Sequence, residues 1–160
     1  MLLYKFSGGI SLLISALLIY LQSRNYTHKK IKQIDAFISL IEYIKNQIEC
    51  YMIPIDRILM TCSEDLISTC GLDTNAHPSN LIELMHLAVF YIDDQSIDVL
   101  YKFANDFGLA YKDEQIRACE QCIKGLSKEK ERISDKDSKD KKVHLAICLC
   151  ISFSLILILM

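Results

Sequence analysis

Charged residues are almost absent from two long apolar segments, and this segregation is the strongest constraint on how the chain folds. Between Leu2 and Leu21 the only charge is Lys5, and the segment from Val143 to Met160 carries none. As helices, these segments of 20 and 18 residues would be about 27–30 Å long, which matches the hydrocarbon core of a membrane. Helices buried in a protein core are the alternative. We predict membrane-spanning helices at residues 1–22 and 143–160.

Basic residues cluster at the inner ends of both segments. Arg24 and three lysines lie between the first segment and the first acidic residue, Asp35, and four more lysines come shortly before the second segment. These lysines are Lys29, Lys30, Lys32, Lys136, Lys139, Lys141 and Lys142. The positive-inside rule then predicts that residues 22–142 lie in the cytoplasm and both termini outside. A cleaved signal peptide is the alternative for the first segment, but Leu21-Gln22-Ser23-Arg24 has no small-x-small cleavage site, so we expect an uncleaved anchor.

The residues between the two segments have the spacing of an all-α fold. Apolar residues recur at three- and four-residue steps over residues 31–52, so the first apolar helix is expected to continue to about Met52. Pro54 suits the first turn of a second helix that continues through Ile67. Gly71 marks the loop that follows. No stretch alternates polar and apolar residues as a half-buried strand would.

Three further segments complete the predicted helical domain. Residues 81–91 are apolar enough for a fully buried third helix. Asp93 or Asp94 caps a fourth helix, and Gly108 lies just past its end. Asp113 caps a last helix that runs on into the second apolar segment. The prediction is a cytoplasmic helical bundle over residues 23–126, followed by a helical stalk over residues 127–142.

The stalk is highly charged, with twelve charges in sixteen positions and Ile133 as its one aliphatic residue. We interpret it as a solvated helix. The alternative is that Lys139, Lys141 and Lys142 bind lipid headgroups. The acids between these lysines make that alternative less favourable.

Acidic residues concentrate between residues 53 and 112, a segment that contains nine acids and three bases. Such a segment favours a basic partner surface, because opposite charges steer and orient association. Asp93, Asp94 and Asp98 are the candidate docking residues. The alternative is an ordinary solvated helix surface with an N-cap. The net charge of −2 gives no indication of nucleic-acid binding.

Cysteine and histidine, which often act in catalysis or metal binding, have structural explanations in this sequence. Cys119 and Cys122 form a CxxC pair without the companion ligands of a zinc site or the βαβ context of a thioredoxin, so packing inside a helix is the preferred interpretation. His86, with Glu83 one turn earlier, is expected to be a partly buried histidine rather than a general base. No cofactor, metal site or enzymatic activity is predicted.

Small residues form one stripe in each apolar segment. Helices in a bilayer associate by close packing at such residues. The stripes are Ser7, Ser11 and Ser15 in the first segment, and Ala146, Cys150 and Ser154 in the second. We expect them to contact neighbouring membrane subunits. Packing against each other and chance occurrence are the alternatives.

Local motifs carry a resemblance to a known family. Residues 47–55 follow the pattern E-I-x-Y-x-x-T-P-L, with Ile48 and Pro54 retained and different residues at Gln47, Cys50 and Ile53. Phe107-Gly108 with Gln115 follows L-G-x-x-D-x-x-x-Q, although Tyr111 stands at the aspartate position.

The third motif is a lysine-rich entry into a terminal apolar helix at Lys141-Lys142, where Ala146 and Cys150 replace the usual glycines. In this order, with an anchor at each end, the motifs resemble the stage III sporulation protein AB family of endospore-forming bacteria over essentially the whole chain.

The resemblance implies a specific role. The family belongs to the channel apparatus between mother cell and forespore, and its cytoplasmic domain is similar to that of type II secretion system protein F. It implies that residues 22–142 dock a stage III sporulation AA-type ATPase on the mother-cell side, while the spans hold other channel membrane proteins. A homo-oligomer is left open. The alternative function is a small membrane sensor or regulator whose helical domain binds a ligand or a signalling protein.

Overall fold

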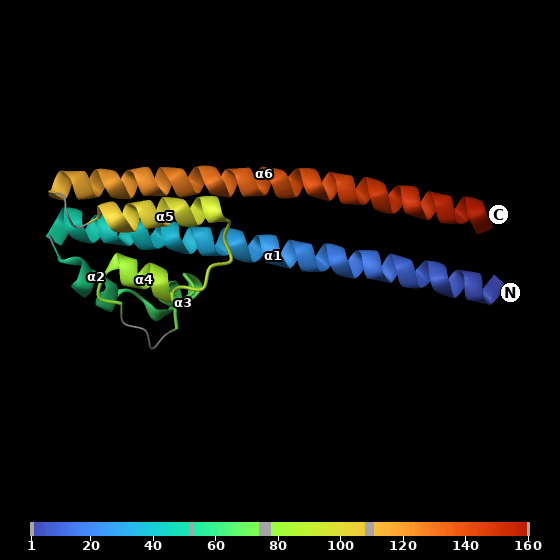
Figure 1. Cartoon of the computed structure of the whole chain (residues 1–160), viewed down its shortest axis with the longest axis horizontal. Coiled ribbons are helices and arrows are strands. Elements are labelled where there is room, and N and C mark those ends of the chain that lie inside the picture. Colours follow the sequence, from blue (N-terminus) through green and yellow to red (C-terminus); the bar gives the residue numbers. More distant parts are fainter. Residues whose placement is uncertain (1, 52, 74–77, 108–110, 160) are drawn as a thin grey trace. The chain divides into compact units, whose positions relative to one another are not determined.

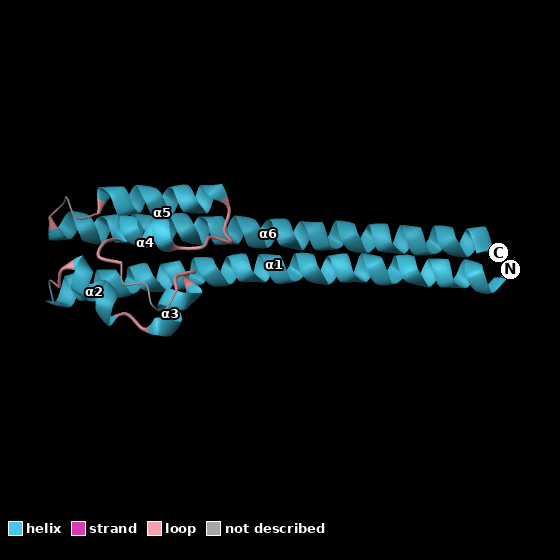
Figure 2. Cartoon of the chain, turned by 60° about the horizontal axis from the view of Figure 1, so that its bottom comes forward, coloured by secondary structure: helices cyan, strands magenta, loops and turns pink. Residues whose placement is uncertain are grey.

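The structure is a computed structural model that describes residues 2–51, 53–73, 78–107 and 111–159. Within these ranges the chain forms six α-helices and no β-strand, so the all-α prediction is confirmed (Figures 1 and 2). The helices are α1 (Leu2–Tyr51), α2 (Ile55–Thr61), α3 (Glu64–Thr69), α4 (Leu81–Leu87), α5 (Asp94–Asp106) and α6 (Lys112–Leu159).

The chain divides into two units, one of residues Lys29–Arg132 and one that combines Met1–His28 with Ile133–Met160. The second unit consists of the first part of α1 and the last part of α6. Both helices are continuous, as the sequence predicted. Apart from Gln22, Val143 and Ile147, the side chains of the two predicted spans lie outside the described residues. Within the part of the chain whose side chains are described, no helix is long and apolar enough to cross a membrane.

The core of the Lys29–Arg132 unit is organised around α1. Its buried residues recur at three- and four-residue steps, so one stripe of the helix faces the core. They are Ile34, Phe37, Leu40, Ile41, Ile44 and Ile48. Phe37 stacks on Phe90 with the ring centroids 5.8 Å apart. The other long helices of the unit add Leu100, Phe103 and Ala104 from α5 and Cys119, Cys122 and Leu126 from α6.

Contacts between helices fix the framework of this unit. Two ion pairs show that α1 and α6 run antiparallel. Lys45 bonds Glu120 and the earlier Asp35 bonds the later Lys130, both at 2.6 Å. α5 approaches α6 closely at Gly125, where an added Cβ would lie 3.0 Å from a methyl of Val99. α4 in turn packs against α5.

Residues 53–93, which carry α2, α3 and α4, are called the insertion below. The predicted single helix from Pro54 through Ile67 is wrong, because the chain is extended at Cys62 and Ser63 and a new helix begins at Glu64. Ser63 is a residue type that competes with the backbone for hydrogen bonds and favours helix starts. Glu64 and Asp65 then lie in the first turn of α3, where acids stabilise the positive end of the helix.

The predicted third helix is wrong in length and in burial. α4 ends at Leu87 and the backbone is extended at Ala88. The Val89 N–H donates to the Gly71 carbonyl at 2.9 Å, so a tertiary contact takes a group that a longer helix would have used. Ile82 and Leu87 are exposed rather than buried.

The predicted helix starts are only partly correct. Asp93 occupies the N-cap position of α5, although its side chain makes no capping bond. α6 begins at Lys112, so Asp113 lies in the first turn and does not cap the helix. Gly108 lies outside the described residues. In the stalk, Ile133 is buried whereas most of its described neighbours are exposed.

Candidate docking surface

Asp93 lies at a junction of three helices. Its carboxylate accepts a hydrogen bond from the Lys30 ammonium of α1 and lies 3.4 Å from the Arg132 guanidinium of α6. Arg132 also bonds Glu129 at 2.7 Å. The Lys30 hydrogen bond holds the pKa of Asp93 below its ordinary value, with partial burial opposing it. The Asp93 carboxylate therefore links α1 and α6 to the start of α5.

Asp94 and Asp98 are placed differently from Asp93. Both are exposed on α5, one turn apart. Lys102, also exposed, follows one turn after Asp98. The three acids singled out from the sequence are therefore one structural carboxylate and two surface carboxylates beside a lysine.

We predict that Asp93→Asn lowers the stability of the domain by about 1 kcal/mol at neutral pH, the size expected for a half-exposed charged pair. Because the pKa of Asp93 is depressed in the folded state, its contribution is present above the ordinary carboxyl value of 3.8 and is lost as the pH falls below it. The difference in melting temperature between wild type and Asp93→Asn should therefore shrink between pH 7 and pH 3. Asp98→Asn is the matched control and should show little difference at either pH.

The insertion exposes several large apolar side chains. Five are at least 40% exposed, namely Met60, Ile82, Leu87, Val89 and Tyr91. Exposed acids lie along the same segment, among them Asp56, Glu64 and Asp65. Apolar side chains rimmed by charge are typical of protein–protein contact surfaces.

A buried glutamine fixes the position of the insertion on α1. The Gln33 amide donates to the carbonyl oxygens of Cys70 at 2.9 Å and Val89 at 2.7 Å. Its carbonyl accepts the Tyr91 N–H at 2.7 Å. These contacts, together with the Gly71–Val89 hydrogen bond, are called the Gln33 junction below. Gln33 is not among the candidate residues named from the sequence, although a polar residue one turn before Phe37 on the buried stripe is a signal that would have identified it.

The CxxC cysteines are buried in α6, as the packing interpretation expects. Burial raises the pKa of the Cys119 thiol to about 12, although the Lys45 charge opposes the shift. Burial, with a smaller effect of Cys119, raises the pKa of Cys122 to about 12. No group of three or more His, Cys, Asp or Glu side chains among the described residues is arranged to hold a metal ion. His86 is exposed, contrary to expectation, with its ring 6.0 Å from that of Tyr101.

We predict that Cys119 and Cys122 resist alkylation in the folded protein. At pH 8 a thiol with a pKa of about 12 is ionised in only about one molecule in ten thousand, and the thiolate is the reactive form. Exposed Cys50 should be modified by iodoacetamide first, as peptide mass spectrometry would detect. Equal rates at the three sites in the folded protein would contradict the packing interpretation. Cys119→Ala with Cys122→Ala should cost only about 2 kcal/mol of stability.

The remaining predicted residues lie mostly beyond the described set. The side chains of Ser7, Ser11, Ser15, Ala146, Cys150 and Ser154 are outside the described residues, as are those of Lys141 and Lys142. Lys139 is exposed.

No protein-family model matches the chain, and no curated protein or solved structure matches it.

Proposed function

We propose that this chain is a non-enzymatic membrane adaptor of the stage III sporulation AB type, which docks a secretion-type ATPase through its helical domain. The sequence motifs support the family, and the two apolar segments support the anchors. The observation that carries the adaptor role is the insertion, whose exposed apolar side chains occur beside exposed acids. Such a surface suits a partner that offers an apolar patch with basic residues around it.

In this proposal the apolar side chains and the acidic side chains of the docking surface contribute differently to binding. Apolar side chains that become buried supply most of the affinity, because binding energy concentrates at a few well-packed residues. The acids supply orientation and association rate. Ile82 and Leu87 on α4 are the apolar candidates, and Asp94 and Asp98 on α5 are the acidic ones. Asp93 is left out of the docking set because Lys30 and Arg132 already engage it.

The test is capture of the stage III sporulation AA-type ATPase of the same organism by the full-length protein in detergent. Ile82→Ser with Leu87→Ser should weaken capture by about tenfold, equivalent to about 1.4 kcal/mol. Tyr51→Ser with Tyr111→Ser removes two exposed apolar side chains outside the insertion and should leave capture unchanged. Absence of capture by the wild-type protein would contradict the adaptor role and favour a sensor or regulator.

Charge reversal tests the acids separately. Asp94→Lys with Asp98→Lys should slow association several-fold at low salt and have a smaller effect at high salt, because salt screens exposed charges. The matched control is Glu131→Lys with Asp135→Lys, two exposed acids of α6. If both pairs have the same effect, the acids of α5 act only through net charge.

A further inference from the structure

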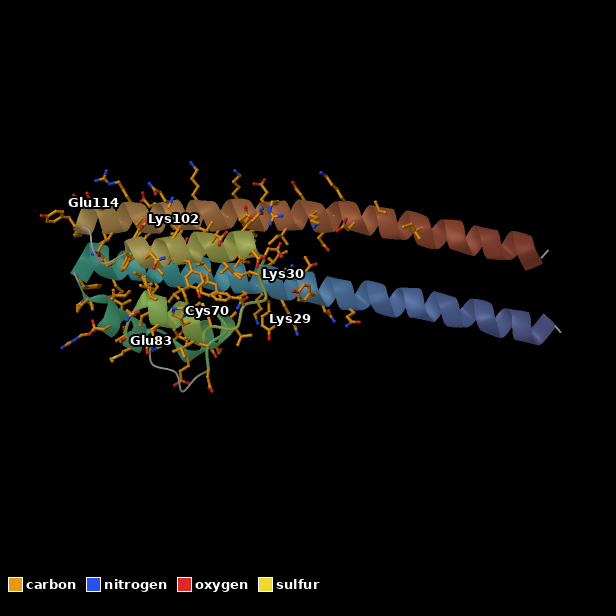
Figure 3. All side chains as sticks on the ribbon, in the orientation of Figure 1. Lys29, Lys30, Cys70, Glu83, Lys102 and Glu114 are labelled. Carbon is orange, nitrogen blue, oxygen red and sulfur yellow. The ribbon has the colours of Figure 1, made fainter. Side chains whose placement is uncertain are left out.

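The Gln33 junction borders a pocket that the sequence analysis did not identify. Its volume is about 340 Å³, and its walls come from α1, from the end of α3 and from the extended segment after α4. The lining residues are Lys29, Lys32, Gln33, Ser68, Thr69 and Tyr91. Figure 3 labels Lys29 on α1 and Cys70 in the insertion beside it.

The charge of this pocket is positive. Lys29 and Lys32 are three residues apart on α1 and therefore lie on one face of the helix. Among the described residues, neither lysine forms an ion pair with a carboxylate, whereas their neighbour Lys30 is held by Asp93. Asp35, one turn after Lys32, bonds Lys130 at 2.6 Å. Lys30 and Asp35 are therefore paired within the fold, whereas Lys29 and Lys32 contribute two ammonium groups to the pocket.

The pocket is also held in shape from within. Gln33 is 2% exposed and bonds backbone groups on both sides of the pocket, at Cys70 and Tyr91. The Lys29 ammonium lies over the ring of Tyr91, another lining residue, 5.8 Å from its centre, which is within the range of a cation–π contact. The hydroxyls of Ser68 and Thr69 donate to the Asp65 carbonyl, so the two lysines are the groups that would bind an anion.

The position of the lysines in the sequence indicates which anion they would bind. Lys29 follows Leu21, the end of the apolar segment, by eight residues in the sequence. Basic residues that closely follow a membrane-spanning segment in the sequence are typical contacts of anionic lipid headgroups, and a lysine side chain can extend its ammonium toward them.

We propose that Lys29 and Lys32 in this pocket bind the phosphate group of an anionic phospholipid. The inference rests on the proposed membrane anchoring and does not depend on the ATPase. Lipid binding here would hold the insertion close to the surface by electrostatic attraction, which two lysines strengthen appreciably in an anionic membrane.

The test uses the full-length protein in a neutral detergent, titrated with soluble dioctanoyl phosphatidylglycerol and followed by native mass spectrometry. Lys29→Gln with Lys32→Gln should weaken binding by about 30-fold, as expected for two lysines near a lipid phosphate. The matched control, Lys124→Gln with Lys128→Gln, removes two exposed lysines of α6 and should leave binding unchanged. Equal loss in both pairs would overturn the proposal.

Two further arms identify the source of the phosphate. Dioctanoyl phosphatidylcholine, which has no net charge, should bind much more weakly than phosphatidylglycerol; equal binding would overturn the proposal. Inorganic phosphate should compete only weakly, and competition at the affinity of the lipid would assign the pocket to a soluble anion instead. ATPase capture by Lys29→Gln with Lys32→Gln, measured in parallel, separates failure of the pocket from failure of the adaptor role.

Discussion

Replacing Gln33 by leucine should destabilise the helical domain by about 4 kcal/mol, the largest effect we expect from an uncharged side chain. The substitution keeps the volume roughly constant but removes three hydrogen bonds, to the carbonyls of Cys70 and Val89 and from the N–H of Tyr91. Each buried backbone group left without a partner costs about 1–3 kcal/mol, with the partly buried ones at the low end. The insertion should therefore loosen from α1.

Two measurements on the full-length protein in detergent check this prediction. Thermal unfolding followed by circular dichroism gives the loss of stability. Hydrogen–deuterium exchange should show faster exchange over residues 67–73 and 88–92 before the rest of the domain opens. Gln47→Leu is the matched control, since Gln47 lies on the same helix and is partly exposed. Similar exchange in both variants would contradict the role assigned to Gln33.

Gly71→Ala should destabilise the domain by about 3 kcal/mol. Gly71 has a φ of +98°, a conformation that costs a residue with a side chain about 1–2 kcal/mol. An added Cβ would also lie 2.4 Å from the Val89 carbonyl oxygen and 2.8 Å from the Gln33 amide nitrogen. Since the first of these is backbone, it cannot move without breaking the Gln33 junction.

Gly125→Ala is the matched control for this substitution. Gly125 is helical, and its added Cβ would meet only the side chain of Val99, at 3.0 Å. The gain in helix propensity, about 1 kcal/mol, offsets that crowding, so the melting temperature should change little. If Gly71→Ala proved as mild as Gly125→Ala, the junction would be more adaptable than its contacts indicate.

The two large effects should not add. Gln33 and Gly71 both contact the Val89 backbone, so either substitution alone breaks the same junction. The double variant Gln33→Leu with Gly71→Ala should therefore lose clearly less stability than the two single losses combined.

The docking residues chosen from the sequence were defined by charge, and charge alone does not distinguish their roles. Asp93 and Asp94 are adjacent acids, yet Asp93 is paired with Lys30 and Arg132 while Asp94 is exposed. The lysines divide in the same way, because Lys30 is used within the fold whereas Lys29 and Lys32 line the pocket. Lys30 and Arg132 lie 63 and 39 residues from Asp93 in the sequence, and no local pattern specifies such distant partners.

The sequence by itself determined the helical framework of this protein. Periodicity identified the buried stripe of α1. The absence of glycine and proline between Gly9 and Pro54 predicted that the first apolar helix continues unbroken to about Met52, and α1 does end at Tyr51. The same reasoning predicted that α6 continues through the stalk. Helix propensity and amphipathic spacing are local properties, and long helices repeat them over many turns, so the pattern alone is sufficient there.

Only the tertiary structure decided the course of the insertion. Its apolar residues suggested two longer helices, but α4 ends at Leu87 because the next residues bond Gly71 and Gln33 instead of continuing the helix. A short helix has few internal hydrogen bonds to lose, so distant partners can set its end. The basic pocket also depends on the early end of α4. Tyr91 reaches Lys29 only because the chain is extended after that helix.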